Sequence, residues 1–130
     1  MATQTVKKMK NVVAWFEVPA IDIKRAKKFY QNIFDIEMDD IELDNFKMSM
    51  FPAEDGGVGG ALCQHEEYKP SHEGTLVYFN SNPDLQTVVD KIEEEGGKVL
   101  QPKTKITDEY GYMAIFEDTE GNRIGLHSDN

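Results

Sequence analysis

Residues 12–34 read VVAWFEVPAIDIKRAKKFYQNIF, and they contain the pattern that decides the fold. The first part, VVAWFEV, is rich in β-branched and aromatic residues and ends at Pro19, which is typical of a strand. In the second part Asp22 is a candidate N-cap, and apolar residues recur at helical spacing while the basic residues occupy the other side. The stretch therefore predicts a strand followed directly by an amphipathic helix.

The same order of elements recurs in the second half of the chain. After the first helix, IEMDDIEL, NFKMSMF and GVGGALCQ predict three strands separated by turn-prone residues. Then GTLVYFN predicts a strand, SNPDLQTVVDKIEEEGG predicts a helix that stops at its glycine pair, and three more strands are predicted by KVLQP, YGYMAIFED and NRIGLHS. Each half therefore predicts strand, helix, strand, strand, strand.

This repeat indicates two modules that share one core, because neither sheet could cover its own apolar face well. We expect a single domain over residues 1–130. Its expected parts are a first module at about 11–64, a linker at about 65–73 and a second module at about 74–128.

Composition and charge narrow the possible partners. The chain has 130 residues, of which 39% are apolar, enough for one domain with a real core. Its formal charge of −10 repels phosphate backbones and anionic lipid surfaces, so we expect no nucleic-acid partner and no membrane partner. No apolar run approaches the roughly 20 residues of a membrane helix, and the start lacks the apolar segment of a secretory signal. We therefore expect a cytoplasmic protein.

Three segments carry a resemblance to a known family. These segments are DIKRAKKFYQNIFDIE after a strand, EEEGGKVL after the second helix and FEDTEGNRIGL near the end. They resemble the vicinal oxygen chelate superfamily, which includes glyoxalase I, bleomycin resistance proteins and extradiol dioxygenases. Within that superfamily, the sequence is most similar to the uncharacterised group of glyoxalase-related predicted enzymes, on the basis of GGVGGAL, TLVYFN and DTEGNRIGLHS. The resemblance implies an α+β fold in which two βαβββ modules form a U-shaped mixed sheet around a cavity, commonly completed as a homodimer.

The resemblance also implies where a metal ion would bind. Glyoxalase-type members place His, Gln or Glu ligands on the first and last strand of each module, so that a divalent cation chelates two neighbouring substrate oxygens. Carried over to this sequence, the four positions fall on Trp15, Thr75, Gly125 and one of Gly60, Ala61 or Leu62, where the strand register stays open. None of these side chains is a good ligand. We expect no metal and no other cofactor, and a divalent metal only if the register differs from this one.

Two polar side chains are candidates for catalysis. Alternation along the first strand places Trp15 and Glu17 on the cavity face, with Phe16 and Val18 toward the helix. A carboxylate beside an aromatic wall can act as an acid or base, or can attract a cationic ligand. His127, on the last strand, can shuttle a proton at the cavity rim. The alternative is that Glu17 is a solvated rim carboxylate and His127 an edge histidine.

The remaining candidates would line the ligand cavity. By the same alternation, the inward-pointing side chains are Trp15, Met48, Thr75, Phe79 and Tyr112. On the strand of Tyr112, Met113 and Ile115 form the alternative inward set. Met48 belongs to a methionine stripe that suits an adaptable apolar pocket or plain core.

Three functions stay open at this point. The first is a metal-free small-molecule-binding protein with a glyoxalase or bleomycin-resistance resemblance. The second is an enzyme, either a lyase or isomerase related to lactoylglutathione lyase or a dioxygenase, which is metal-dependent or uses Glu17 or His127 as a base. The third is a sequestering protein that resembles antibiotic-resistance proteins. Their ligands are cationic, so an acidic chain would attract them.

Overall fold

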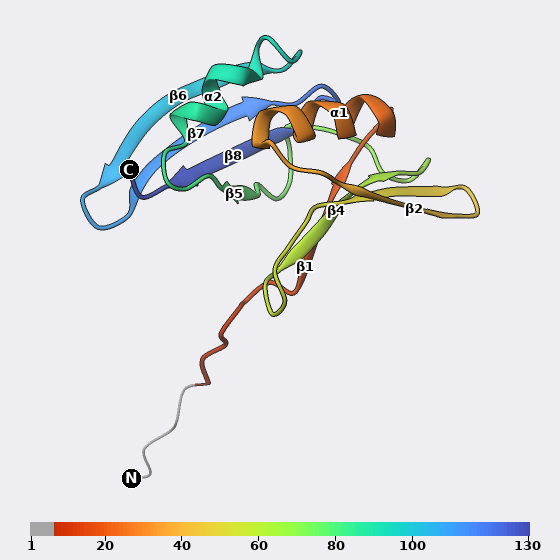
Figure 1. The fold of residues 1–130 in the computed structure, drawn as a ribbon, viewed down its shortest axis with the longest axis horizontal. Helices are drawn as coiled ribbons and strands as arrows, with labels where there is room; N and C mark the ends of the chain where they lie inside the picture. Colours follow the sequence, from red (N-terminus) through yellow and green to blue (C-terminus); the bar gives the residue numbers. More distant parts are fainter. Residues whose placement is uncertain (1–6) are drawn as a thin grey trace.

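A computed structural model describes residues 7–130 of the chain (Figure 1). The first module consists of β1 (Trp15–Pro19), α1 (Ile23–Phe34), β2 (Asp39–Leu43), β3 (Phe46–Met50) and β4 (Gly59–Gln64). The second module consists of β5 (Tyr78–Asn80), α2 (Gln86–Ile92), β6 (Lys98–Thr107), β7 (Gly111–Glu117) and β8 (Arg123–Ser128). The predicted α+β fold of two βαβββ modules is confirmed.

The strands form two mixed sheets of four strands each, rather than one continuous sheet. The orders are β1-β4-β3-β2 and β5-β8-β7-β6, so the two modules have the same topology. In each module the first strand pairs in parallel with the last, and the other pairs are antiparallel. In Figure 1 the two sheets lie at an angle to each other, with α1 near the place where they meet.

Helix α1 forms because both of its ends are capped and one of its faces is apolar. The Asp22 side chain accepts hydrogen bonds from the backbone N–H groups of Lys24 and Arg25, both at 3.1 Å, as the sequence predicts for an N-cap. Asp35 ends the helix in the left-handed conformation, with φ of 55°. The buried face consists of Ala26, Phe29, Tyr30 and Ile33. Within residues 7–130 neither helix is long and apolar enough to cross a membrane.

Three element boundaries differ from the sequence-based expectation. Helix α2 ends at Ile92, because Glu93 to Gly96 form turns before the glycine pair is reached. Strand β5 contains only Tyr78–Asn80, whereas the whole of GTLVYFN was expected to be extended. Strand β6 continues past Pro102 to Thr107, because register shifts against β7 absorb the proline, which cannot donate a ladder hydrogen bond.

The two modules share one core that is rich in aromatic rings. Phe16 of β1 and Phe79 of β5 meet edge to face, with ring centroids 5.4 Å apart. Phe29 of α1 packs against Phe116 of β7, at 5.9 Å between ring centroids. Tyr30 contacts rings from both modules and is completely buried. Helix α1 therefore covers apolar surface of both sheets.

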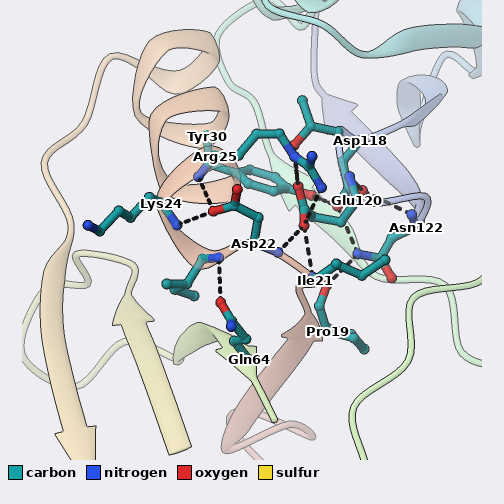
Figure 2. A network of polar contacts seen from close by, with 12 residues as sticks. Pro19, Ile21, Asp22, Lys24, Arg25, Tyr30, Gln64, Asp118, Glu120 and Asn122 are labelled. Atoms are coloured by element: carbon teal, nitrogen blue, oxygen red, sulfur yellow. Dashed lines mark hydrogen bonds and ion pairs between the residues drawn. The ribbon is translucent and has the colours of Figure 1, made fainter. Parts of the chain in front are cut away.

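The loop between β7 and β8 joins the modules through a buried carboxylate (Figure 2). The Tyr30 hydroxyl donates to Asp118 Oδ2 at 2.7 Å. The side-chain amide of Asn122 donates to the same oxygen at 2.9 Å and to the backbone carbonyl of Pro19 at 2.7 Å. Burial raises the pKa of Asp118, against the hydrogen bonds from Asn122 and Tyr30, which favour the carboxylate.

Glu120, in the same loop, caps the start of α1 from outside the helix (Figure 2). Its Oε1 accepts from the backbone N–H groups of Ile21 and Asp22 at 2.8 and 2.7 Å, and its Oε2 accepts from Arg25 Nε at 2.7 Å. Burial opposes its ionisation, but the bonds from Arg25 and Asp22 outweigh burial and lower the pKa of Glu120. One loop of the second module therefore fixes both the end of β1 and the first turn of α1.

Removal of the Tyr30 hydroxyl should destabilise the fold. In Tyr30→Phe, Asp118 loses one donor while it stays buried, so we expect the free energy of unfolding to fall by about 1–3 kcal/mol. The measurement is urea-induced unfolding. The matched control is Tyr78→Phe, because the Tyr78 hydroxyl has no hydrogen bond to residues 7–130 and lies on an exposed side chain. Equal losses for the two variants would contradict the role given to the Asp118 bond.

The Arg25–Glu120 pair should give the fold a defined pH dependence. Because the folded-state pKa of Glu120 lies below its ordinary value of 4.5, its stabilisation is complete above that value and is lost as pH falls through the folded-state pKa. We expect Glu120→Gln to cost about 1–3 kcal/mol at pH 7 and progressively less below pH 4.5. Urea unfolding of both chains across pH 3–7 measures the difference, and since both keep Asp118, that difference isolates Glu120. A pH-independent difference would contradict the assignment.

Candidate functional site

Each sheet has one face in the shared core and one face turned away from it. On β1, Phe16 and Val18 belong to the core, while Trp15 and Glu17 are exposed, as predicted. On β8, Ile124 and Leu126 are in the core. We call the other two faces the open faces. They carry Trp15, Glu17 and Met48 on the first sheet and Tyr78, Arg123 and His127 on the second.

Glu17 is the centre of a polar group on the first open face. Its Oε2 accepts a hydrogen bond from Trp15 Nε1 at 3.2 Å, and its Oε1 accepts one from the Tyr68 hydroxyl at 2.6 Å. Tyr68 comes from the segment after β4, so the carboxylate is held from two parts of the chain. Two donors from rigid aromatic side chains give Glu17 a fixed position, and its remaining lone pairs can accept from a ligand.

The environment of Glu17 keeps neighbouring hydroxyl and thiol groups protonated. The hydrogen bond to Glu17, with a smaller effect of burial, raises the pKa of Tyr68 to about 12. Burial, followed by the charge of Glu17, raises the pKa of the Cys63 thiol to about 12. Tyr68 therefore acts as a hydrogen-bond donor at neutral pH, and Cys63 is not a nucleophile there.

An apolar wall lies beside this group. Met48 is half-buried and pairs with Cys63 of β4, which places it on the same open face as Glu17. Phe46, two residues earlier, lies edge to face with Tyr68 at 5.1 Å between ring centroids. The methionine stripe therefore borders the open face, and Met48 is outside the core cluster.

His127 and Tyr78 lie on the open face of the second sheet. His127 Nε2 is 2.6 Å from the backbone carbonyl of Tyr110, in the turn between β6 and β7, so this nitrogen is the donor. That bond attaches β8 to the neighbouring hairpin. Tyr78 leads β5 and is 47% exposed. His127 thus has a structural bond on one nitrogen, and Tyr78 presents a free aromatic face.

Two predicted cavity residues lie on the opposite face. Phe79 pairs with Leu126 and packs in the aromatic core, and Tyr112 packs against the core with the Lys103 ammonium 4.6 Å from its ring centroid. The predicted orientation of Tyr112 was wrong, because Met113 and Ile115, the alternative set on β7, are on the open face. Phe79 faces the core but also lines a groove, so its place in a ligand cavity stays a prediction. Thr75 precedes β5 and is exposed, outside any strand. In these segments aromatic residues occur at both phases of the alternation, so the pattern does not choose a face.

An aromatic ring covers a glycine at equivalent positions of the two modules. Trp15 pairs with Gly59 of β4, and a Cβ on that glycine would lie 3.3 Å from Trp15 Cζ3. Tyr78 pairs with Gly125 of β8, where a Cβ would lie 2.4 Å from Tyr78 Cδ1. Each pair joins the first strand of a module to its last strand. The glycines give the rings space to lie on the sheet.

Two cavities lie along the seam between the modules. A groove of about 1040 Å³ has an aromatic floor of Phe16, Phe34, Phe51 and Phe79. A smaller pit of about 200 Å³ lies at the end of β1 and the start of β8, and Glu17 is among its lining residues. Thr75 lines both cavities.

Comparison with known proteins agrees with this geometry. The family model described as the Glyoxalase/Bleomycin resistance protein/Dioxygenase superfamily matches residues 12–126. The chain belongs to this superfamily. A relative from Didymella fabae, described as a glyoxylase-like domain-containing protein, is 29% identical over 116 residues, which cover 85% of this chain and 88% of the relative.

Solved structures of superfamily proteins share the fold. A glyoxylase/bleomycin resistance protein/dioxygenase domain from Frankia sp. EAN1pec has a TM-score of 0.71 and 15% identity, covering 94% of this chain and 100% of that one. The trypanothione-dependent glyoxalase I of Leishmania major has a TM-score of 0.66 and 16% identity, covering 92% and 88% of the two chains. At these identities the similarity shows the fold alone.

The residues at the metal positions implied by the superfamily do not fit a metal ion. The indole of Trp15 has no lone pair for a metal, and the hydroxyl of Thr75 is a poor ligand for a transition metal. The other two positions, Gly125 and one of Gly60, Ala61 or Leu62, have no side-chain donor. Among residues 7–130, no three His, Cys, Asp or Glu side chains are grouped so that they could hold a cation. Of the four positions, Thr75 lies before the start of β5 at Tyr78.

Sequence reasoning missed three residues of the open faces. Tyr68 lies in a segment that was interpreted as a linker, and only the fold brings it to Glu17. Tyr78 precedes the candidate Phe79 on the same strand and lies on the other face of the sheet. Arg123 was not among the candidates, although it shares the open face of the last strand with His127. The pairing of first and last strands in each superfamily module could have identified Tyr78 as the counterpart of Trp15.

A side chain at Gly125 should displace the ring of Tyr78. A Cβ there would lie 2.4 Å from Tyr78 Cδ1, near the root of the ring, so we expect Gly125→Ala to lower the free energy of unfolding by about 1–3 kcal/mol. The control is Gly59→Ala, where the contact with Trp15 is 3.3 Å and a shift of a few tenths of an ångström relieves it. Urea unfolding measures both, and an equal or larger cost at Gly59 would contradict this packing.

Proposed function

We propose that this superfamily member binds a small organic molecule on its open faces without a metal ion. The observation that carries the proposal is the pair of aromatic rings over glycines, Trp15 over Gly59 and Tyr78 over Gly125. One member of each pair, Trp15 in the first and Gly125 in the second, is at a position for which the superfamily resemblance implies a metal ligand. Aromatic faces bind planar and apolar groups by stacking, and such a surface needs no metal.

Glu17 supports the same function as a polar anchor. Trp15 and Tyr68 hold its carboxylate in one position before any ligand arrives, which reduces the entropy that binding must overcome. The half-buried Met48 nearby provides an adaptable apolar surface. A ligand with an apolar body and a hydrogen-bond donor fits this combination.

A second function, a metal-independent lyase or isomerase, has one observation in its favour. The fixed Glu17 carboxylate faces solvent and could accept a proton from a bound substrate, as a general base does. His127 has less support as a base, because its Nε2 is already bonded to the Tyr110 carbonyl. Loss of turnover in Glu17→Gln would identify this function.

A homodimer in the cytoplasm remains part of the proposal. Ile41 and Leu43 on β2 are 38% and 60% exposed. Strand β2 is the edge of its sheet, so a second copy could cover these side chains and pair with that edge.

Metal ions should neither copurify with the protein nor stabilise it. We expect elemental analysis of protein prepared without chelator to find much less than one equivalent, and nickel, zinc, manganese and iron(II) to leave the thermal midpoint unchanged. Trp15 is the only tryptophan of the chain, so its emission reports on the open face in the same titrations. One equivalent of bound metal, or a saturable change with one of these ions, would overturn the metal-free proposal.

A ligand screen provides the positive arm of this test. Compounds that raise the thermal midpoint should also change Trp15 emission, and Glu17→Gln should weaken those with a donor group at least tenfold. The matched control is Glu42→Gln on β2, an exposed carboxylate away from this face. Compounds that stabilise the protein equally in both variants and leave Trp15 emission unchanged would place the binding site elsewhere.

A further inference from the structure

The pit at the end of β1 has polar walls from both modules. It has a volume of about 200 Å³ and includes Glu17 of β1 and Arg123 of β8. The segment between β4 and β5 supplies Lys69, Ser71, Glu73 and Thr75, and the β7–β8 loop supplies Asn122. The backbone N–H of Arg123 donates to the carbonyl of Ser71 at 3.3 Å, so this segment lies against the start of β8.

Arg123 has no ionic partner in the described part of the chain. Its Nε is buried and has no hydrogen-bond partner within residues 7–130. None of the ion pairs in that range includes it. A buried donor without an acceptor costs free energy, so an external acceptor at this N–H would relieve that cost.

The carboxylate opposite Arg123 is engaged elsewhere. Glu117 of β7 is the register partner of Arg123 on β8, an arrangement in which opposite charges can attract each other. Instead, Glu117 Oε2 lies 2.5 Å from His72 Nε2. The chain has only one other arginine, Arg25, which forms two hydrogen bonds to Glu120. Arg123 is therefore the arginine left available to an external anion.

We propose that Arg123 binds the acidic group, a carboxylate or phosphate, of the small molecule that the protein takes. This inference rests on the proposed binding function and specifies its ligand class. A guanidinium presents a planar fork of N–H donors that matches two oxygens of either group. Lys69, which forms no ion pair within residues 7–130, adds positive charge, and the Thr75 hydroxyl can donate at the same wall.

The two carboxylates of the pit, Glu17 and Glu73, limit which ligands can bind there. Glu17 already accepts from Trp15 and Tyr68, which offsets part of its charge. A ligand that places its anionic group at Arg123 therefore needs a neutral or donor group toward Glu17, since a second negative group there would be repelled. The class that fits is a small molecule with a single acidic group.

Side-chain NMR of the whole protein tests the proposal directly. With two arginines in the chain, the ¹⁵N spectrum contains two Nε–H signals, and Arg123→Lys assigns them by removing one. Inorganic phosphate and acetate serve as probes, with chloride at equal ionic strength as the reference. We expect a saturable shift of the Arg123 signal with at least one probe and none of the Arg25 signal, because Glu120 already occupies that guanidinium. The probe that acts identifies a tetrahedral or a planar acidic group.

Variants decide whether the response belongs to Arg123. Arg123→Gln should weaken probe binding at least tenfold, as reported by backbone amide signals of residues 69–75. Lys47→Gln, which removes an exposed positive charge on β3, should change it less than twofold. If Arg123→Gln does not fold, Arg123→Lys replaces it, because lysine keeps the charge but loses the fork. The proposal would be overturned if the probes bound Arg123→Gln, or Arg123→Lys in its place, as tightly as Lys47→Gln. It would also be overturned if the probes shifted the Arg123 signal no more than chloride does.

The outcome is separable from that of the metal experiment. Stoichiometric metal together with a specific Arg123 response would remove the metal-free proposal and keep the anion site. Absence of metal together with an unresponsive Arg123 would remove the anion site alone.

Discussion

The buried carboxylate of Asp118 is the group on which the arrangement of the two modules depends. A carboxylate in an apolar core needs hydrogen-bond donors. Here the donors include the Tyr30 hydroxyl of α1 and the backbone and side-chain N–H groups of Asn122 in the same loop, and the Asn122 side chain also donates to the end of β1. Satisfying one charge therefore fixes the β7–β8 loop, the first helix and the first strand relative to one another. Because β1 and β8 carry Glu17 and Arg123, the same bonds determine the distance between the two polar groups of the open faces.

The repeated topology explains why both open faces have the same character. In each module the first and last strands are parallel neighbours, so each module offers a pair of adjacent positions across these strands. A scaffold of this kind suits a chelate when the pairs are ligands, because four donors converge from two modules. In this chain the pairs are rings over glycines, so the same geometry presents two aromatic surfaces. The fold supplies positions, and the residues at those positions determine the chemistry.

The sequence predicts the elements of this fold better than it predicts which way their side chains face. Helix α1 and the phase of β1 follow from spacing, because Asp22 is a strong cap and Glu17 marks the wet side. On β5 and β7 the alternation is between two apolar sets, so Phe79 and Tyr112 could not be distinguished from Tyr78 and Met113 by period alone. The partnership of Glu17 with Tyr68 depends on a contact across 51 residues, which no local pattern encodes.

The two arginines show why a candidate site needs the structure. Both follow acidic motifs and look alike in the sequence, as charged positions at the start of an element. Arg25 binds Glu120 because the β7–β8 loop places the Glu120 carboxylate beside the first turn of α1. The Glu120 side chain is fully buried there. Arg123 faces Glu117 across the ladder, but His72 from the intermodule segment takes that carboxylate instead. Whether an arginine stabilises the fold or remains open to a ligand is thus decided by the tertiary competition for each carboxylate, not by the residue type.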